Sequence, residues 1–130
     1  MKTILHTPNA PEAIGPYSQA VRWGDMLFCS GQIALLPDGD DRLLNENVAI
    51  QCRQALENME AILITAGTGW ENVVKVNVSL VDMADFAAIN AVYEQFFGDT
   101  KPARACVAVA GLPKGARIEI ECIAGIPSNK

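Results

Sequence analysis

Histidine is almost absent from the sequence, and cysteine never occurs in a C-x-x-C pair. The only histidine among 130 residues is His6. A zinc site needs several His or Cys ligands at close spacing, and a serine–histidine relay needs a histidine with partners, so we expect neither. Each of the four cysteines stands in an apolar run: Cys29, Cys52, Cys106 and Cys122. This placement favours buried, reduced thiols over a disulfide framework.

Long apolar runs are also missing. No stretch approaches the roughly 18 apolar residues that a membrane-spanning helix requires. The N-terminal stretch MKTILHTPNAPEAIGP has only a very short apolar run, which proline and glutamate follow at once, unlike a secretory signal. From these two absences we expect a cytoplasmic protein that does not enter a membrane.

Basic residues are few. Lys plus Arg number 10 and Asp plus Glu number 15, which gives a net charge of -5 at pH 7. Nucleic-acid binding needs a cationic surface that neutralises phosphates, and no basic cluster offers one, so a nucleic-acid partner is not expected. Half of the residues are hydrophobic and 19% are charged, as in globular chains. We therefore expect residues 1–130 to form one domain.

Apolar periodicity predicts two helices and four strands. The helices show apolar stripes at helical spacing, whereas the strands show alternation or short apolar runs. Two helices can cover only one face of a sheet, so we predict an α+β fold with one sheet and both helices on one face. The expected helices are 47–66 and 83–98, and the expected strands are 26–33, 72–81, 104–110 and 117–124.

The other face of the expected sheet has no helix to cover it. Strict alternation in segment 72–81 assigns four residues to the helix-covered face: Val74, Val76, Val78 and Leu80. The uncovered face would carry small and polar side chains such as Asn77, Ser79, Cys106 and Ala108. Because the strand 104–110 is nearly apolar on both sides, we predict that this face contacts other subunits.

Arg104 stands among small apolar residues in its expected strand. Alternation places it on one face with Cys106, and it places Glu119 and Glu121 together on one face of the last strand. If these two strands pair as a hairpin in the right register, all four side chains lie on one face; a slip by one residue would separate them. The guanidinium could then bind a carboxylate bidentately while a glutamate orients or deprotonates water. The alternative is a solvent-edge arginine paired with glutamate for modest stability, and the pattern leaves both open.

Further positions are candidates, each with a simpler alternative. Tyr17 projects from a Gly-Pro turn, where a tyrosine usually packs a loop. At Ser30–Gly31 a strand ends; glycine there lets backbone N–H groups approach a ligand, although a β-bulge explains it equally well. Asn90, on the rim of the second helix's apolar stripe, is either a surface amide or an interface hydrogen-bonding group. Cys106 could be a nucleophile, but no activating base accompanies it, which favours a packed thiol.

Six blocks of the sequence carry a resemblance to a known family. They are AIGPYSQAV, SGQI, QCRQALENMEAIL, VVKVNVSLVDMADFAAINAVYEQFF, PARACVAV and LPKGARIEIECIA. Through them the chain resembles the RidA (YjgF) family of enamine/imine deaminases over nearly its whole length. The resemblance implies a chorismate-mutase-like α+β fold with a mixed sheet, assembled as a homotrimer with sites between subunits. It also implies hydrolysis of 2-aminoacrylate and related imines, which pyridoxal-phosphate-dependent dehydratases release, to 2-keto acids and ammonia without a cofactor or metal.

By position, the resemblance assigns the carboxylate-binding arginine to Arg104 and the water-positioning glutamate to Glu119. The other substrate-binding positions that it implies are Tyr17, Ser30, the backbone N–H of Gly31, Asn90 and Cys106. The acidic loop PDGDDRLLNENV and the turn GTGWENV depart from the usual family pattern, so substrate preference stays open. Two alternatives also remain: the ribonuclease or translation-inhibiting activity attributed to some members, against which the acidic balance argues, and non-catalytic binding of a small carboxylate or partner protein.

Overall fold

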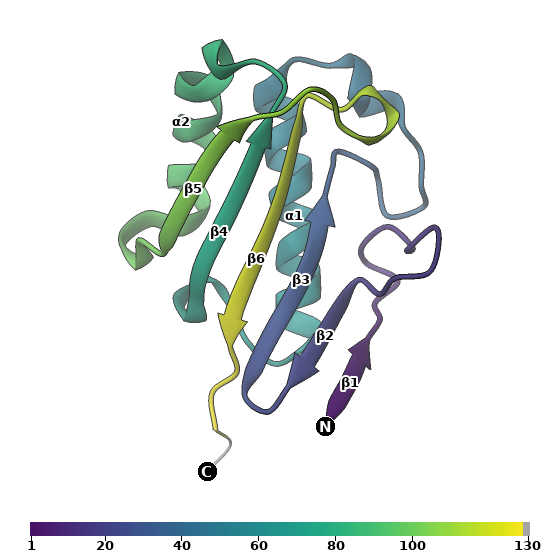
Figure 1. Cartoon of the computed structure of the whole chain (residues 1–130), viewed down its shortest axis with the longest axis vertical. Coiled ribbons are helices and arrows are strands. Elements are labelled where there is room, and N and C mark those ends of the chain that lie inside the picture. The colour runs from purple at the N-terminus through teal and green to yellow at the C-terminus, as the bar shows by residue number, and fades with distance from the viewer. Residues whose placement is uncertain (129–130) are drawn as a thin grey trace.

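A computed structural model of the protein describes residues 1–128 and shows strands and helices joined by short 3-10 turns (Figure 1). The strands are β1 (Lys2–Leu5), β2 (Ala20–Trp23), β3 (Met26–Gln32), β4 (Val73–Leu80), β5 (Ala103–Ala108) and β6 (Ile118–Gly125). The helices are α1 (Val48–Thr65) and α2 (Phe86–Phe97). Both predicted helices and all four predicted strands are present, and β1 and β2 are additional.

The strands form one mixed sheet in the order β1-β2-β3-β6-β4-β5. All neighbours are antiparallel except β4 and β5, which run parallel. In Figure 1, α1 and α2 lie behind the sheet, so its front has no helix over it. This arrangement confirms the predicted α+β class, with one mixed sheet and both helices on one face.

The main apolar core fills the space between the sheet and the two helices. Alternate residues of β6 are buried in it, as the sequence predicts: Ile118, Ile120, Cys122 and Ala124. The helices contribute fully buried side chains, among them Leu56, Met59, Leu63 and Ile89. Burying one large aliphatic side chain contributes about 1.5–3 kcal/mol, so this packing fixes both helices against the sheet.

Local capping sets where each helix begins. Asn47 precedes α1, and its side-chain oxygen accepts a hydrogen bond from the Ile50 N–H at 3.0 Å. The side chain of Asp82 accepts a hydrogen bond from the Ala84 N–H, as expected of a cap, but it starts a 3-10 turn, Met83–Asp85. Helix α2 therefore begins at Phe86, three residues later than predicted.

The alternation of β4 is interrupted near its start. Val73 is opposite Ala124 of β6, whereas Lys75 is opposite Ile123, so the register shifts between them. Such a bulge inserts one residue and turns the preceding side chain to the other face. Val73 is consequently buried, and Val74 is 49% exposed. The prediction that Val74 lies in the core was wrong, because Val73 and Val74 are identical residues and the sequence does not show which of them faces the core.

Strands β5 and β6 do not pair, so the hairpin on which a shared face for Arg104 and Glu119 was conditional is not formed. Strand β4 lies between them, parallel to β5 and antiparallel to β6. A parallel pair requires a crossover, and α2 with its flanking turns provides it. Arg104 is opposite Val76 and so lies on the helix-covered face, whereas Glu119 is opposite Ser79 on the uncovered face. Within one chain the arginine and the glutamates do not share a face.

The same register corrects which residues of β5 face the helices. Cys106 is opposite Val78 and Ala108 is opposite Leu80, so both lie on the helix-covered face. Ala105 and Val107 take the places on the uncovered face that the sequence had assigned to Cys106 and Ala108. The relation between Arg104 and Cys106, two residues apart on one face, was predicted correctly.

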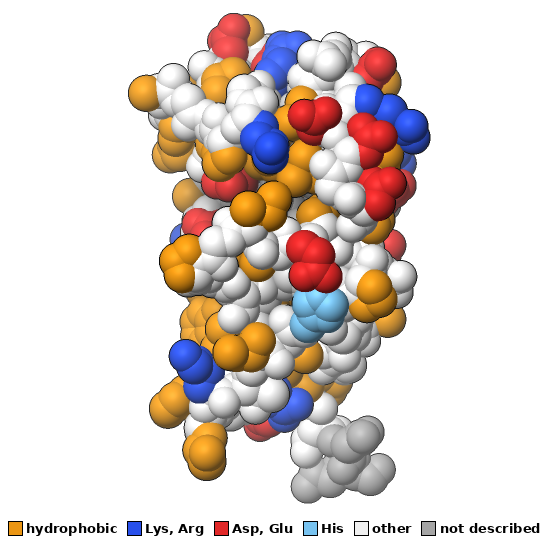
Figure 2. Space-filling model, turned by 90° about the vertical axis from the view of Figure 1, so that its right-hand side faces the viewer, with side chains coloured by type: hydrophobic (Ala, Val, Ile, Leu, Met, Phe, Trp, Pro, Cys, Tyr) orange, Lys and Arg blue, Asp and Glu red, His pale blue; other side chains and the backbone are white. Residues whose placement is uncertain are grey.

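The edge of the molecule beside β1 carries the acidic loop. Figure 2 shows acidic side chains gathered in the upper half of this side, and below them the histidine against an acidic side chain. His6 Nε2 and Glu12 Oε1 are 2.7 Å apart. The loop folds beside a second, smaller apolar cluster of Ile33, Leu35 and Ala116, with Leu44 and Leu112 packed against it. Across residues 1–128, no helix combines the length and apolar character needed to cross a membrane.

Candidate functional site at Arg104 and Glu119

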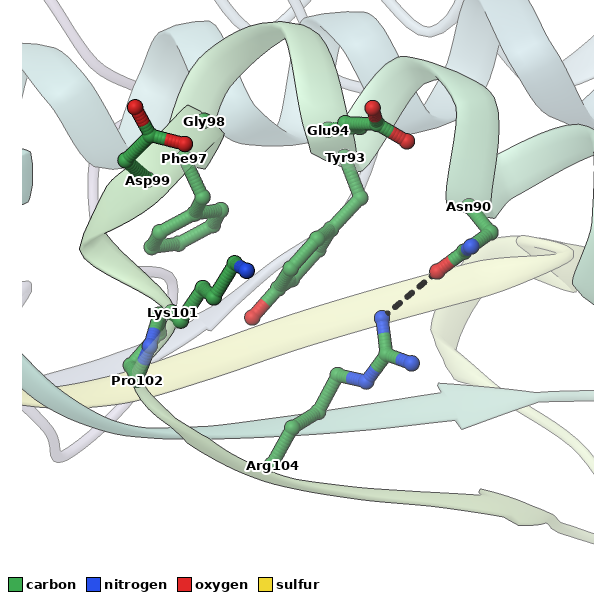
Figure 3. A pocket seen from close by; sticks show the side chains of 9 residues that line it. All are labelled: Asn90, Tyr93, Glu94, Phe97, Gly98, Asp99, Lys101, Pro102 and Arg104. Carbon is green, nitrogen blue, oxygen red and sulfur yellow. Dashed lines mark hydrogen bonds between the residues drawn. The ribbon is translucent and has the colours of Figure 1, made fainter.

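Arg104 extends from β5 toward α2, which supplies three contacts to it (Figure 3). Its Nη1 donates a hydrogen bond to Asn90 Oδ1 at 2.8 Å. Its guanidinium carbon lies 4.7 Å from the centroid of the Tyr93 ring and 5.3 Å from that of Phe86. These residues stand at i, i+4 and i+7, so one side of the helix holds the arginine. No carboxylate among residues 1–128 forms an ion pair with it.

An open hollow of about 720 Å³ adjoins the arginine between α2 and the chain segment 98–104. Arg104, Asn90 and Tyr93 all line it (Figure 3). A guanidinium has five N–H donors in a planar fork, and the bond to Asn90 uses only one of them. The remaining donors can bind a carboxylate through two parallel hydrogen bonds, a geometry that lysine lacks.

Cys106 shares the face of Arg104 and is half-buried. Burial raises the pKa of its thiol, and the nearby positive charge of Arg104 opposes that rise to a smaller extent. A thiol with a raised pKa carries little thiolate at neutral pH and is a poor nucleophile. The structure therefore favours a Cys106 packed against the core over a nucleophilic one.

Glu119 lies on the other face, against a bulge in β3. The register between β3 and β6 shifts between Cys29 and Gln32, which puts the bulge at Ser30–Gly31 and confirms that interpretation of the glycine. A Cβ atom added at Gly31 would lie 2.6 Å from Glu119 Cδ. Only glycine lets the backbone come this close to the carboxyl group.

The environment of Glu119 disfavours its ionised form. Burial raises the pKa of its carboxyl group, and the negative charge of Glu121 adds to the rise. Glu121 itself accepts a hydrogen bond from Asn77 Nδ2 at 3.3 Å. Glu119 has no ion-pair partner in the described part of the chain. A half-buried carboxyl group with a raised pKa is a stronger base than an ordinary carboxylate, which suits it to proton transfer.

Tyr17 stands at the rim of a second hollow, of about 350 Å³, which Gly31 and Glu119 also line. Its hydroxyl oxygen accepts a hydrogen bond from the Ile14 N–H at 3.4 Å. Ser30 is turned differently, since its hydroxyl donates to the Ser18 carbonyl at 2.5 Å and its N–H donates to the Gln19 carbonyl. Ser30 thus anchors the bulge that carries Gly31.

The predicted site residues therefore form two groups on opposite faces of the sheet. The arginine group consists of Asn90, Arg104 and Cys106 on the helix-covered face, and the glutamate group consists of Tyr17, Ser30, Gly31 and Glu119 on the uncovered face. The contacts of Phe86 and Tyr93 with Arg104 were not predicted, because both residues belong to the apolar stripe of α2 and look like core residues in the sequence. Their helical spacing with Asn90 was the available signal.

The described residues offer no cluster of side chains that could bind a metal ion. Within residues 1–128, no three His, Cys, Asp or Glu side chains lie close enough together to hold an ion. The donors that the two groups offer are a guanidinium, amides, hydroxyls and one carboxyl group. This set suits a small organic acid better than a cation.

Comparison with known proteins gives matches over almost the whole chain. Residues 7–126 match the family model described as Endoribonuclease L-PSP. The chain is 50% identical over 126 residues to the RutC family protein slr0709 of Synechocystis, covering 96% of this chain and 97% of that protein. It is 46% identical over 127 residues to the Escherichia coli protein named "Putative reactive intermediate deaminase TdcF", covering 95% and 97% of the two chains.

Solved structures give the same result. Escherichia coli TdcF with bound serine matches with a TM-score of 0.89 and 44% identity, over 96% of this chain and 99% of that one. The YjgF gene product of Escherichia coli matches with a TM-score of 0.88 and 46% identity, over 95% and 98% of the two chains. RidA from an Antarctic Psychrobacter matches with a TM-score of 0.90 and 44% identity, over 95% of this chain and 99% of that one.

Proposed function

The chain belongs to the RidA/YjgF (L-PSP) family, and from this membership we propose that it is a hydrolytic deaminase of reactive 2-enamine and 2-imine acids such as 2-aminoacrylate. The products are 2-keto acids and ammonia, and the whole chain, residues 1–130, acts as one unit. The observation that carries this proposal is the Arg104 guanidinium, which is held by Asn90 beside an open hollow and has no carboxylate paired with it among residues 1–128. The related TdcF structure contains serine, a small molecule with a carboxylate.

Two copies of the chain are needed to build one site in this proposal. Arg104 and Glu119 lie on opposite faces of their own sheet, so one small substrate cannot touch both in a single chain. A neighbouring copy can bring its glutamate group to the arginine group of the first. Exposed apolar side chains on the uncovered face support such contact, including Phe28 (46% exposed) and Val107 (52% exposed). A closed homotrimer, which the family resemblance implies, would contain three such sites.

The substrate's carboxylate binds first, on Arg104. Asn90 occupies Nη1, which leaves the Nε–Nη2 edge of the guanidinium for two parallel hydrogen bonds. Because α2 holds the arginine in place before the substrate arrives, little ordering remains to be done on binding. This step orients C2 of the imine toward the glutamate group.

Hydrolysis then needs one water molecule and no cofactor. The enamine tautomerises to the imine, and Glu119 accepts a proton from the water while the water oxygen forms a bond to C2. Glu119 passes this proton to the imine nitrogen, which gives a carbinolamine. A second transfer through Glu119 takes the proton of the hydroxyl group to the amino nitrogen, so the C–N bond breaks, the nitrogen leaves as ammonia, and the oxygen becomes the keto oxygen. Glu119 is suited to this exchange because burial raises the pKa of its carboxyl group.

The remaining members of the two groups shape the site. Tyr17 and the backbone N–H of Gly31 border the water and the developing carbinolamine on the glutamate side. Ser30 fixes the bulge through its bond to Ser18. Cys106 lines the arginine side without attacking the substrate.

Arginine variants in a dehydratase-coupled serine assay test the proposal. Arg104→Ala should abolish the acceleration of pyruvate release, and Arg104→Lys should lose at least about tenfold because it keeps the charge and loses the fork. Arg53→Lys is a matched control, since Arg53 also bonds to an amide, Gln95, and lies over an aromatic ring, Phe96. Near-normal activity of Arg104→Ala would overturn the proposal.

The family description as an endoribonuclease supports a second candidate, RNA cleavage. The net charge of -5 argues against it, because RNA binding needs cationic contacts with phosphates. Cleavage that survives both Arg104→Ala and rigorous purification would favour it. The variant Glu119→Gln distinguishes the hydrolase from a third candidate, a protein that binds a small carboxylate without catalysis. In a hydrolase the variant should lose turnover and keep its affinity for pyruvate. In a binding protein it should leave the function unchanged.

A further inference from the structure

The hydroxyl group of Tyr93 is buried and has no hydrogen-bond partner among residues 1–128. The residue as a whole is only 8% exposed. The buried amides behave differently, since Gln19, Gln51 and Asn58 all hydrogen-bond to backbone groups. Leaving a buried hydroxyl unpaired costs free energy, and such groups are rare enough to need an explanation.

The position of the ring explains which partner the hydroxyl group can reach. The Tyr93 ring is stacked on Phe97, with 4.3 Å between centroids and 25° between planes, so it cannot swing to another site. Its other contact is the Arg104 guanidinium, 4.7 Å from the ring centroid. In Figure 3 the hydroxyl end of the ring is directed toward Lys101 and Pro102, which line the same hollow of about 720 Å³ as Arg104. A ligand on Arg104 therefore enters the hollow at whose wall this hydroxyl group is buried.

We propose that the Tyr93 hydroxyl is a substrate-binding group, which donates a hydrogen bond to the acid group held by Arg104. The inference rests on the proposed function in one respect, namely that Arg104 binds a small carboxylate. A phenolic O–H is a good donor to an ionised carboxylate, and such charge-assisted bonds are stronger than neutral ones. The free protein carries an unpaired hydroxyl group, and the ligand satisfies it on binding.

The protonation state of Tyr93 agrees with a donor role. Burial raises the pKa of its hydroxyl group, and the positive charge and the N–H groups of the neighbouring Arg104 guanidinium offset only part of the rise. These N–H groups can only donate toward the hydroxyl oxygen, so the O–H hydrogen itself stays available to a ligand. The phenol therefore keeps its proton throughout the neutral range and offers it to an incoming carboxylate.

The variant Tyr93→Phe removes the hydroxyl group and keeps the ring beneath the guanidinium. We expect the dissociation constant for pyruvate, measured by calorimetry, to rise about tenfold through loss of a bond to a charged group. The melting temperature should stay the same or rise, because the unpaired buried group is gone. The amide of pyruvate, which lacks the negative charge, should bind weakly and equally to both proteins.

A direct readout uses the small number of tyrosines. Tyr17 and Tyr93 are the only two, so carbon-13 at the tyrosine Cζ position gives two signals, which Tyr17→Phe assigns. The Tyr93 signal should move when pyruvate is added, and it should remain in place when Arg104→Ala is titrated in the same way.

Two results would overturn the inference. Unchanged pyruvate affinity in Tyr93→Phe would show that the ligand does not use the hydroxyl group, and a clear fall in melting temperature would show that the group already has a partner in the free protein. Either result leaves the proposed function standing if Arg104→Ala loses pyruvate binding. Full pyruvate binding by Arg104→Ala would instead remove the proposed function itself.

Discussion

The arginine group and the glutamate group differ in how much of their final environment one chain supplies. Around Arg104, a single helix provides a hydrogen-bond acceptor, Asn90 Oδ1, and two aromatic faces, so the charge is oriented before any ligand binds. Glu119, by contrast, lies against the backbone of Gly31 and near the like charge of Glu121. The surroundings of Arg104 therefore stabilise its positive charge, whereas the surroundings of Glu119 disfavour its negative charge.

This difference assigns separate tasks to the two groups. A preorganised arginine gives binding and orientation, because its geometry is fixed in advance. A carboxyl group with a raised pKa gives proton transfer, because it is a stronger base than an ordinary carboxylate and accepts a proton from water more readily. Substitutions in the arginine group should therefore act mainly on affinity, whereas substitutions in the glutamate group should act mainly on turnover.

Gly31→Ala should have the largest effect of the variants on the glutamate side. The new Cβ would lie 2.6 Å from Glu119 Cδ, so the carboxyl group must move. Because the group that moves is the end of a flexible side chain, we expect a stability change below about 1 kcal/mol together with a loss of kcat of about 100-fold or more. Gly111→Ala is the matched control, since its Cβ meets nothing within 4 Å. Wild-type turnover in Gly31→Ala would show that the position of Glu119 does not matter.

Asn90→Ala should have a smaller effect, and on a different constant. It removes the acceptor that holds Nη1 of Arg104 and leaves both aromatic contacts in place. We expect KM to rise about three- to tenfold with little change in kcat, as for the loss of one hydrogen bond. Gln95 lies on the same helix as Asn90, and its amide accepts a hydrogen bond from Arg53 of α1. The control Gln95→Ala removes this amide and should leave both constants unchanged. A fall in kcat at constant KM would contradict the division of tasks.

The sequence predicted the fold class and most element bounds because those depend on local patterns. The alternation of Ile118, Ile120 and Cys122 identified the core side of β6, and helical spacing identified the stripe of α1. Strand pairing, however, depends on contacts between residues far apart in the chain. There is no local sign in the sequence that β4 lies between β5 and β6, so whether Arg104 and Glu119 share a face could be stated only as a condition on strand pairing.

For the candidate site, too, the sequence predicted relations within one strand but not contacts between elements. Position along a strand correctly put Arg104 and Cys106 on one face, because that relation needs only two-residue periodicity. The bulge at Ser30–Gly31 could be suspected from a glycine in a strand, but its meaning came from the nearness of Glu119. The role of Tyr93 was hidden, since a tyrosine in an apolar stripe looks like any other core residue until its hydroxyl group is located.

Glu121→Gln should change the pH dependence of the glutamate side. The negative charge of Glu121 contributes to raising the pKa of Glu119, after burial, so its removal lowers that pKa. Glu119 must be ionised to accept a proton from water, and activity falls as the pH drops through its pKa. The acid limb of the profile of kcat/KM against pH should therefore move to lower pH in the variant. Glu57→Gln, on an exposed position of α1, should leave the limb where it is, and a shift to higher pH in Glu121→Gln would contradict the electrostatic argument.

The thiol of Cys106 offers the mildest test, on the arginine side. Burial raises the pKa of this thiol more strongly than the charge of Arg104 lowers it, so the thiol is largely protonated at neutral pH. We expect the native protein to react with a disulfide reagent at Cys106 no faster than a free thiol does, with a rate that rises with pH above neutrality. Cys29, Cys52 and Cys122 are buried and should react only after unfolding. Rapid labelling of Cys106 at pH 7 would mean that Arg104 dominates the local field, and it would return a nucleophilic role to this cysteine in place of the water that Glu119 activates.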